Sequence, residues 1–345
     1  MVRIAKTLRL AAKTSRLAVK GSRAFWAATH LLASPWLPTM AALGSPSPAG
    51  RVVEVKDFGS NPGGLRMFVY APAKKLRSGA PLIVVLHGCG QDAASFARNA
   101  GWIALAERIG AALLLPEQIS KNSRGRCFNW YQPTDVRRGG GEALSIRQMT
   151  RAAITRFASD PRRVFVVGLS AGGAMAAALL AAYPSVFAAG AVVAGMPVGA
   201  ASNGVSALYR MRRADPLASR LGLAEAARRA APKTARPRVW PRISIWQGGR
   251  DSVVDPGNGA ALAAQWSALH GYDETPTAEF APMPGVRRRL WSTPKKSAVE
   301  FWTLAEMGHG FPIASGPEDG RAGYGVIDNG LPAARHIAKF WGIET

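Results

Sequence analysis

A serine between glycines joins an apolar run to a helix-like segment in the sequence RRVFVVGLSAGG, residues 162–173. Residues 164–167 have the length and β-branched content of a buried strand, and the segment AMAAALLAAY that follows has the composition of a helix. Gly168 and Gly172 flank Ser170 as in the G-x-S-x-G strand–turn–helix motif, where only glycine lets the strand and the helix pass each other. Because such a turn exposes the serine oxygen, the stretch predicts that Ser170 is a nucleophile. A Gly/Ser loop is the plainer alternative, since short matches to this motif arise by chance.

Strand-like and helix-like segments alternate from about residue 51 to the end of the chain. The expected strands include PLIVVL, AALLLPE, VFVVGL, AAGAVVAG and RISIWQGG, and the expected helices lie near residues 95–108, 142–157, 259–270 and 332–341. Hairpins are expected around SNPGG at the start and between residues 287–291 and 299–304 near the end. This alternation predicts an α/β fold with a mostly parallel central sheet and helices on both faces. Residues 201–240 are rich in Ala and Arg and break the rhythm, so we interpret them as an insertion over the edge of the sheet.

The first 50 residues differ from the rest of the chain. Residues 1–23 carry seven Lys and Arg at spacings of three or four, which places them on one face of a helix. An apolar stretch that is interrupted by prolines follows, and after it comes the linker GSPSPAG. A basic segment, then an apolar segment, then small residues is the order found in an export signal. We therefore expect residues 1–50 to be a leader and linker for export or surface attachment, and residues 51–345 to form a single catalytic domain.

The chain is strongly basic, with 44 Lys and Arg against 21 acidic residues and a formal net charge of +23. Residues 1–50 contain seven basic residues and no acid, and residues 208–242 contain ten basic residues against Asp215 and Glu225. Neither cluster is accompanied by a zinc-finger spacing, an RNA-binding signature or a basic zipper, so we expect no nucleic-acid partner. The basic leader is suited to contact an anionic membrane or granule surface.

The chain has two cysteines, Cys89 and Cys127, which are too few for a cysteine-rich metal site. Their number alone leaves two free thiols and one disulfide equally open. We expect neither a metal nor a cofactor.

A nucleophilic serine needs a base and an acid, and in an open α/β sheet such groups follow the carboxyl ends of the strands. Asp251 follows the strand-like ISIWQGG, and His309 follows the strand-like EFWTLAEMG. The order Ser170, Asp251, His309 is that of α/β-hydrolases. In these roles His309 takes the serine proton, and Asp251 holds the imidazole and stabilises its charged form. Asp255 is the alternative acid, although it lies one turn further on and directly before a proline.

The other histidines have structural explanations. His87 directly follows the strand-like IVVL, where an oxyanion loop belongs, so we expect it to support that loop. His270 ends one predicted helix and His336 lies on the last one.

Five segments in this order carry a family resemblance: LHGCGQ, CFNWY, GLSAGGAM, WQGGRDSVVDPGN and MGHGFP. Together they resemble the polyhydroxybutyrate depolymerase family of esterases over about residues 51 to 341. The resemblance implies the α/β-hydrolase fold with Ser170, Asp251 and His309 as the triad. It also implies an oxyanion hole made by the backbone amides of Cys89 and Ala171, and a Cys89–Cys127 disulfide beside it. Trp130 and Tyr131 are expected in the substrate pocket.

The chain departs from the family pattern at two places. Phe128 stands where the family often has Trp, and HGFP replaces a commoner small–aromatic pair after the histidine. We expect these departures to affect the substrate pocket more than the triad.

These observations predict a serine carboxylic-ester hydrolase that works through an acyl-enzyme. The expected substrate is a short-chain polyhydroxyalkanoate or its oligomers. Because the sequence ends at Thr345 without a polymer-binding module, we expect soluble oligomers or accessible amorphous polymer. Feruloyl, acetyl and other small esters are the alternative, and a non-catalytic surface-binding protein of hydrolase fold is an alternative of another class. A disulfide would favour an extracellular or periplasmic location over an intracellular, granule-associated one.

Overall fold

A computed structural model describes residues 50–344 except residues 75, 238, 294 and 295. The described part contains a ten-stranded sheet in the order β1-β2-β4-β3-β5-β6-β7-β10-β9-β8 and a small parallel sheet of β11 and β12. The strands are β1 (Val52–Val55), β2 (Arg66–Tyr70), β3 (Leu82–Leu86), β4 (Ala112–Glu117), β5 (Val164–Leu169), β6 (Ala189–Val193), β7 (Arg242–Gly248), β8 (Ala278–Met283), β9 (Val286–Thr293), β10 (Lys296–Leu304), β11 (Phe311–Ile313) and β12 (Val326–Asp328).

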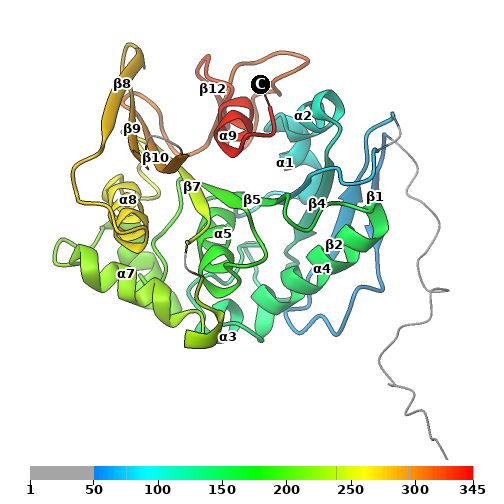
Figure 1. Cartoon of the computed structure of the whole chain (residues 1–345), viewed down its shortest axis with the longest axis horizontal. Coiled ribbons are helices and arrows are strands. Elements are labelled where there is room, and N and C mark those ends of the chain that lie inside the picture. The colour runs from blue at the N-terminus through cyan, green and yellow to red at the C-terminus, as the bar shows by residue number, and fades with distance from the viewer. Residues whose placement is uncertain (1–49, 75, 238, 294–295, 345) are drawn as a thin grey trace, which may run out of the picture. The chain divides into compact units, whose positions relative to one another are not determined.

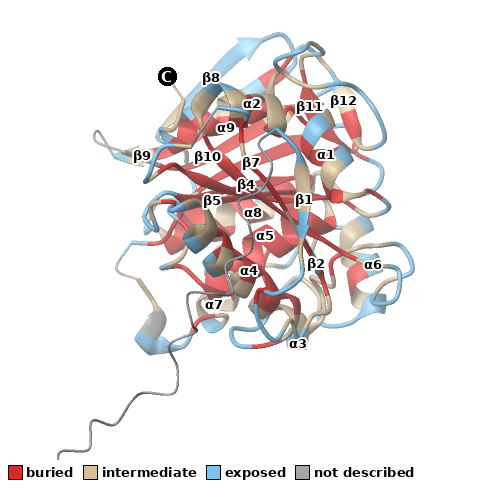
Figure 2. Ribbon diagram, turned by 90° about the vertical axis from the view of Figure 1, so that its right-hand side faces the viewer, coloured by how far each residue is buried: buried red, intermediate tan, exposed pale blue. Residues whose placement is uncertain are grey.

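The middle of the large sheet is parallel and its two edges are antiparallel. Strands β4, β3, β5, β6, β7 and β10 pair in parallel. The hairpin of β1 and β2 lies at one edge and the hairpin of β9 and β10 joins β8 at the other. Inner strands such as β3 and β5 are buried throughout, whereas β8 is mostly exposed (Figure 2). The mostly parallel sheet and both expected hairpins are confirmed.

Helices cover both faces of the sheet (Figure 1). One face packs against α4 (Gly141–Phe157), α5 (Ala171–Ala182), α7 (Arg220–Arg229) and α8 (Gly257–Leu269), and the other packs against α1 (Ala93–Asn99), α2 (Trp102–Ile109) and α9 (Ala333–Trp341). Every residue of α5 is buried, because this helix lies in the middle of its layer. Two short helices, α3 (Pro133–Val136) and α6 (Gly204–Arg212), and a 3-10 turn (Lys233–Ala235) complete the described elements.

The helix expected over residues 95–108 is two helices, α1 and α2. The break comes at Gly101, which has a left-handed φ of 80°. A Cβ at this position would lie 2.7 Å from the carbonyl oxygen of Asp319, so glycine is required by both conformation and space. Gly101 therefore separates the two helices, and the close approach of Asp319 excludes a larger residue there.

The expectation that residues 201–240 lie over an edge of the sheet is wrong. The segment connects β6 and β7, which pair in the interior of the sheet. Its helix α7 buries Ala224 and Ala227 in the core beside α8, and Gln265 of α8 donates a 2.8 Å hydrogen bond to the Leu223 carbonyl. A connection between paired parallel strands has to cross a face of the sheet, and this physical requirement places the insertion.

The described residues belong to one unit of the chain. The predicted leader lies outside the described residues. Among residues 50–344 with the four exceptions above, the helices are too short or too polar to span a bilayer.

Candidate active site

Ser170 stands at a sharp turn between β5 and α5. Its backbone has φ 56° and ψ −118°, a conformation that costs a non-glycine residue energy and is found mostly at functional sites. A Cβ on Gly168 would lie 2.1 Å from the Gly172 carbonyl oxygen, and one on Gly172 would lie 2.4 Å from the His87 carbonyl oxygen. The Ser170 amide donates a 2.9 Å hydrogen bond to Val193 of the neighbouring strand. The two glycines thus permit the turn, and the sheet holds it.

Asp251 and His309 meet beyond the ends of β7 and β10. His309 Nδ1 lies 2.8 Å from Asp251 Oδ2, and the amides of Val253 and Val254 donate to Asp251 Oδ1 at 2.9 and 2.8 Å. Burial opposes ionisation of Asp251, but the hydrogen bonds from His309 and the two amides outweigh it and lower the pKa. A carboxylate only accepts hydrogen bonds, so the ring proton resides on Nδ1. His309 Nε2 is then the nitrogen that can accept a proton.

Asp255 has a different role from Asp251. Its Oδ1 accepts a 2.7 Å hydrogen bond from the Gly257 amide at the start of α8, and its own amide donates to the Met211 carbonyl. The acid that the structure brings to His309 is therefore Asp251.

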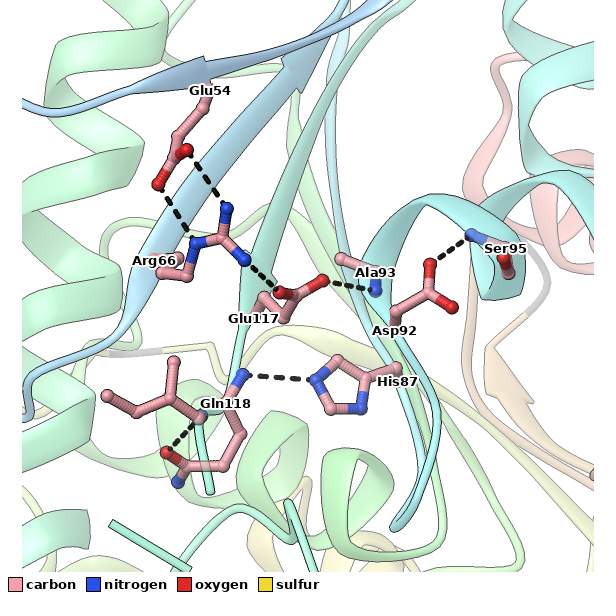
Figure 3. A network of polar contacts seen from close by, with 9 residues as sticks. Glu54, Arg66, His87, Asp92, Ala93, Ser95, Glu117 and Gln118 are labelled. Atoms are coloured by element: carbon pink, nitrogen blue, oxygen red, sulfur yellow. Dashed lines mark hydrogen bonds and ion pairs between the residues drawn. The ribbon is translucent and has the colours of Figure 1, made fainter. Parts of the chain in front are cut away.

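The loop between β3 and α1, residues 87–92, carries the candidate oxyanion donor Cys89. His87 is buried, and this burial lowers its pKa to about 4, so the ring is neutral at physiological pH. His87 Nε2 accepts a 3.1 Å hydrogen bond from the Gln118 amide (Figure 3), and Nδ1–H therefore donates to the Gly88 carbonyl at 2.7 Å. The Gly88 C=O and the Cys89 N–H point in opposite directions from one planar peptide. The His87 ring is therefore one of the groups that hold the Cys89 amide in its direction.

The far end of this loop is fixed by the start of α1 (Figure 3). Asp92 caps the helix by accepting a 2.8 Å hydrogen bond from the Ser95 amide. Glu117, at the end of β4, accepts from the Ala93 amide at 3.0 Å and is itself paired with Arg66 at 3.0 Å. The loop is thus anchored by neighbouring elements on both sides.

A disulfide joins Cys89 to Cys127, as the family resemblance implied. Two hydrogen bonds join the same two loops: the Gly90 amide donates to the Gly125 carbonyl at 2.8 Å, and the Arg126 guanidinium donates to the Gly90 carbonyl at 2.7 Å. The loop before Trp130 is thus attached to the loop that carries Cys89. Ala171 is the first residue of α5, so its amide has no partner within the helix.

Ser170, His309, Cys89 and Ala171 line one cavity of about 560 Å³. Trp130 and Tyr131 also line it, with their rings perpendicular and 5.7 Å apart. Within the described part of the chain, His309 is the only side chain of the lining that can carry a positive charge, and the lining contains no carboxylate. The cavity is therefore suited to a substrate without charge.

The two departures from the family pattern lie behind the cavity. Phe128 is fully buried with its ring 5.0 Å from that of His87, and Phe311 is fully buried against Phe96 and Trp102. Neither phenylalanine is among the lining residues of the described cavity. Both side chains pack into the core, so any effect of these departures on the pocket is indirect.

Several functional positions were not predicted from the sequence. Gln247 donates a 3.1 Å hydrogen bond to Asp251 Oδ2, and Gln91 lies in the cavity wall. Both lie inside recognised segments, WQGGRDSVVDPGN and LHGCGQ, so their positions carried a signal. Val253 and Val254 of the wall also lie inside WQGGRDSVVDPGN. The wall residues outside the recognised segments are Ser123, Met196, Gly204, Ala207, Leu208, Met211, Tyr324 and Gly325.

The sheet order, the serine turn after β5 and the acid–histidine pair beyond β7 and β10 define an α/β-hydrolase. A solved acetyl xylan esterase from Aspergillus awamori has the same fold, with a TM-score of 0.73 and 22% identity over 85% of this chain and 100% of that one.

The sequence comparisons give the family. The profile described as esterase PHB depolymerase matches residues 65–284. A poly(3-hydroxyalkanoate) depolymerase C from Paucimonas lemoignei is 37% identical over 297 residues, 85% of this chain and 70% of the relative. An acetylxylan esterase from Coprinopsis cinerea is 32% identical over 284 residues, 79% of this chain and 73% of the relative. The chain belongs to the polyhydroxybutyrate depolymerase family of esterases and is a carboxylic-ester hydrolase.

Proposed function

We propose that Ser170, His309 and Asp251 form the catalytic triad, and that the Cys89 and Ala171 amides form the oxyanion hole. The observation that carries the proposal is the 2.8 Å hydrogen bond between His309 and Asp251, beside a cavity that Ser170 also lines. This arrangement leaves His309 Nε2 as the base for the serine hydroxyl.

In this mechanism His309 Nε2 takes the Ser170 proton while the serine oxygen attacks the ester carbonyl carbon. The negative charge that develops on the carbonyl oxygen is stabilised by the two backbone amides. Collapse of the tetrahedral intermediate breaks the bond to the alcohol oxygen, which receives the proton from His309. Water then repeats the sequence on the acyl-enzyme and releases the carboxylic acid.

For the substrate we propose a short-chain polyhydroxyalkanoate or its oligomers. Such polyesters carry ester carbonyls and short aliphatic groups along an uncharged chain, which suits the apolar cavity of about 560 Å³. The identity to a poly(3-hydroxyalkanoate) depolymerase, 37%, is higher than that to the acetylxylan esterase, 32%.

The outer face of α6 supports a polymeric substrate. Leu208 and Tyr209 stand three and four residues after Val205, so their side chains share one face of the helix. That face points away from the protein: Val205 is 83% exposed, Leu208 53% and Tyr209 55%. Leu208 also lines the cavity, so the apolar face begins at the mouth of the site. A polyester longer than the cavity would continue onto this aliphatic surface.

We further propose that the protein works outside the cytoplasm, with residues 51–345 as the single catalytic domain and residues 1–50 as an export or surface-attachment segment. The Cys89–Cys127 disulfide supports an oxidising compartment. The leader's basic residues support attachment to an anionic membrane or granule as its other use.

The test is the full-length protein assayed on p-nitrophenyl acyl esters, hydroxybutyrate oligomers, amorphous polyhydroxybutyrate granules, methyl ferulate and acetylated xylan. We expect labelling of Ser170 by a fluorophosphonate and the highest kcat/KM on hydroxybutyrate oligomers. A higher kcat/KM on methyl ferulate or acetylated xylan would overturn the substrate assignment while leaving the triad in place. Absence of labelling and of turnover on every substrate would overturn the triad itself.

A further inference from the structure

The side chain of Gln91 joins two neighbouring loops that line the candidate active site. Its Oε1 accepts a 2.7 Å hydrogen bond from the Gly88 amide, and its Nε2 donates a 2.6 Å hydrogen bond to the Tyr324 carbonyl. Gln91 is 8% exposed and lines the cavity. Glycines lie at both ends of the bridge: a Cβ on Gly88 would lie 3.1 Å from Oε1 and one on Gly325 would lie 2.9 Å from Nε2. The site is therefore shaped around this amide.

The first bond acts on the candidate oxyanion donor. The Gln91 side chain accepts a hydrogen bond from the Gly88 N–H. The Gly88 C=O accepts two hydrogen bonds, one from the His87 ring at 2.7 Å and one from the backbone N–H of Gln91 at 3.3 Å. With both polar groups of Gly88 held, the following peptide can take only one orientation, and the Cys89 N–H belongs to that peptide. A donor that is oriented before the charge develops needs no reorganisation during the reaction.

The second bond acts on the neighbouring loop, which carries Tyr324. Tyr324 lines the cavity although the residue is 75% exposed, so packing restrains it little. A Cβ on Gly90 would lie 3.3 Å from the Tyr324 ring, which places this ring against the loop that carries Cys89. The hydrogen bond from Gln91 to the Tyr324 carbonyl holds the backbone of this residue in place.

We propose that Gln91 is a positioning residue for ester hydrolysis: its acceptor oxygen orients the Cys89 amide, and its donor nitrogen holds the Tyr324 wall of the substrate cavity. The inference rests on the proposed function, because it presumes that the Cys89 amide binds the oxyanion. It assigns the two ends of one side chain to two separable effects. The oxygen affects kcat and the nitrogen affects KM.

Two substitutions of similar length separate the two ends. In Gln91→Glu the carboxylate still accepts from the Gly88 amide, but it repels the Tyr324 carbonyl instead of donating to it. In Gln91→Met both hydrogen bonds are lost. We expect Gln91→Met to lower kcat about tenfold to a hundredfold, which is less than the roughly hundredfold to thousandfold cost of removing an oxyanion donor, because the Cys89 amide is still present. Gln91→Glu should keep kcat within about threefold and raise KM severalfold, as Tyr324→Ala should.

The matched control is Gln148→Met. Gln148 of α4 also bridges backbone and side chain, accepting from the Asn61 amide at 2.9 Å and donating to Ser60 at 2.9 Å, but it does not line the described cavity. All rates are divided by the number of sites that a fluorophosphonate titrates, so a partly unfolded variant is not counted as a slow one. Gln148→Met should keep the wild-type kcat per titrated site.

Binding of phenylboronic acid gives a readout that a purely structural role would not change. The tetrahedral boronate adduct on the serine places an oxygen in the oxyanion hole, so its dissociation constant should rise in Gln91→Met about as far as kcat/KM falls. The inference would be overturned if the wild type is labelled and active and Gln91→Met has the same kcat per titrated site and the same affinity for the boronate. Equal kcat losses in Gln91→Glu and Gln91→Met would also overturn it. A wild type that is neither labelled nor active would instead overturn the proposed function.

Discussion

His309 Nδ1 and Asp251 Oδ2 are 2.8 Å apart, although 58 positions separate the two residues in the sequence. The hydrogen bond forms because β7 and β10 are parallel neighbours, so the loops that follow them emerge at the same edge of the sheet. Gln247 and the amides of Val253 and Val254 satisfy the remaining acceptor positions of the carboxylate. The acid is therefore held in one orientation before a substrate binds.

Asp251→Asn should lower kcat by about three to four powers of ten with a small change in KM. The substituted amide can present an N–H to His309 Nδ1, which favours the wrong ring tautomer for a base. Steady-state kinetics on p-nitrophenyl butyrate measures this. Asp255→Asn is the matched control, because Asp255 caps the start of α8 and an asparagine oxygen can accept the same Gly257 hydrogen bond. A larger loss in Asp255→Asn than in Asp251→Asn would reverse the assignment of the acid.

Replacing both cysteines, as in Cys89→Ala with Cys127→Ala, should reduce stability and turnover together. The crosslink spans 38 positions, and a loop of that length contributes about 4 kcal/mol in the chain-entropy treatment. The thermal midpoint should fall by about 6 °C for a domain of this size. Because the Cys89 amide would be less firmly held, kcat should fall by a larger factor than KM rises.

Calorimetry and kinetics of the double variant test this prediction, and dithiothreitol treatment of the wild-type protein should reproduce both effects. Mass spectrometry of the protein from its native compartment, without reduction, gives the state of the two thiols. Free thiols there would contradict both the crosslink and the proposed export.

The sequence predicts well those features that local chemistry determines. The strand, Gly168, Ser170, Gly172 and the helix lie in one contiguous segment, so the turn is encoded where it forms. The meeting of Asp251 and His309 could be predicted because each lies in the loop after a strand of the parallel part of the sheet. A glycine such as Gly101 is a common end of a helix, but the close approach of Asp319 that also requires glycine there could not be predicted, since it depends on a segment that is distant in the sequence.

The walls of the cavity were difficult to predict for the same reason. Leu208 and Tyr324 come from segments without a recognised motif, and only the folded chain brings them to the serine. The outward apolar face of α6 is visible in the spacing of Val205, Leu208 and Tyr209, but the spacing does not say whether that face points to the core or to solvent. In an isolated sequence, the inward orientation is the ordinary expectation for an apolar stripe.

Val205→Ser with Tyr209→Ser should reduce the hydrolysis of amorphous polyhydroxybutyrate granules while leaving soluble esters almost unaffected. Both side chains lie on the exposed face of α6 and neither lines the cavity of the described structure. Removing two apolar contacts with a polymer surface should weaken adsorption about tenfold. Turnover of p-nitrophenyl butyrate should stay within about twofold, since the cavity is unchanged.

A cosedimentation assay with granules measures adsorption, and release of soluble acid measures turnover. Phe280→Ser is the control for loss of an exposed apolar side chain, because Phe280 lies on the edge strand β8 and is outside the cavity lining. An equal loss of adsorption in the control would indicate nonspecific sticking, and unchanged adsorption in the α6 variant would remove α6 from the polymer-binding surface.

The buried carboxyl of Glu142 should make stability depend on pH through the neutral range. Glu142 lies in the first turn of α4, where Oε2 accepts from the Asn129 amide at 2.9 Å and Oε1 accepts from Gln118 Nε2 at 2.5 Å. Burial raises the pKa of Glu142 to about 8, above the usual value of 4.5. The folded state thus holds this proton more tightly than the unfolded state does.

The sign of the effect follows from the proton balance. Below about pH 4.5 the carboxyl is protonated in both states, and the favourable contribution is complete. Between about pH 4.5 and 8 only the unfolded state releases the proton, so the free energy of unfolding falls by up to about 1.4 kcal/mol per pH unit from this group. Above about pH 8 both states are ionised and the contribution no longer changes.

Glu142→Gln removes this titration and should be tested by urea unfolding at pH 5, 6, 7, 8 and 9. The free energy of unfolding of the wild type minus that of the variant should fall by about 1 kcal/mol per pH unit from pH 5 to 8 and then level off. The sign of the difference at any one pH is not the test, because the amide group introduced by the substitution also changes the contact with Gln118. The test is the slope of this free-energy difference against pH, since the amide of the variant does not titrate. A constant difference from pH 5 to 8 would mean that Glu142 is already ionised in the folded protein at pH 5, and that its hydrogen bonds to Asn129 and Gln118 outweigh its burial.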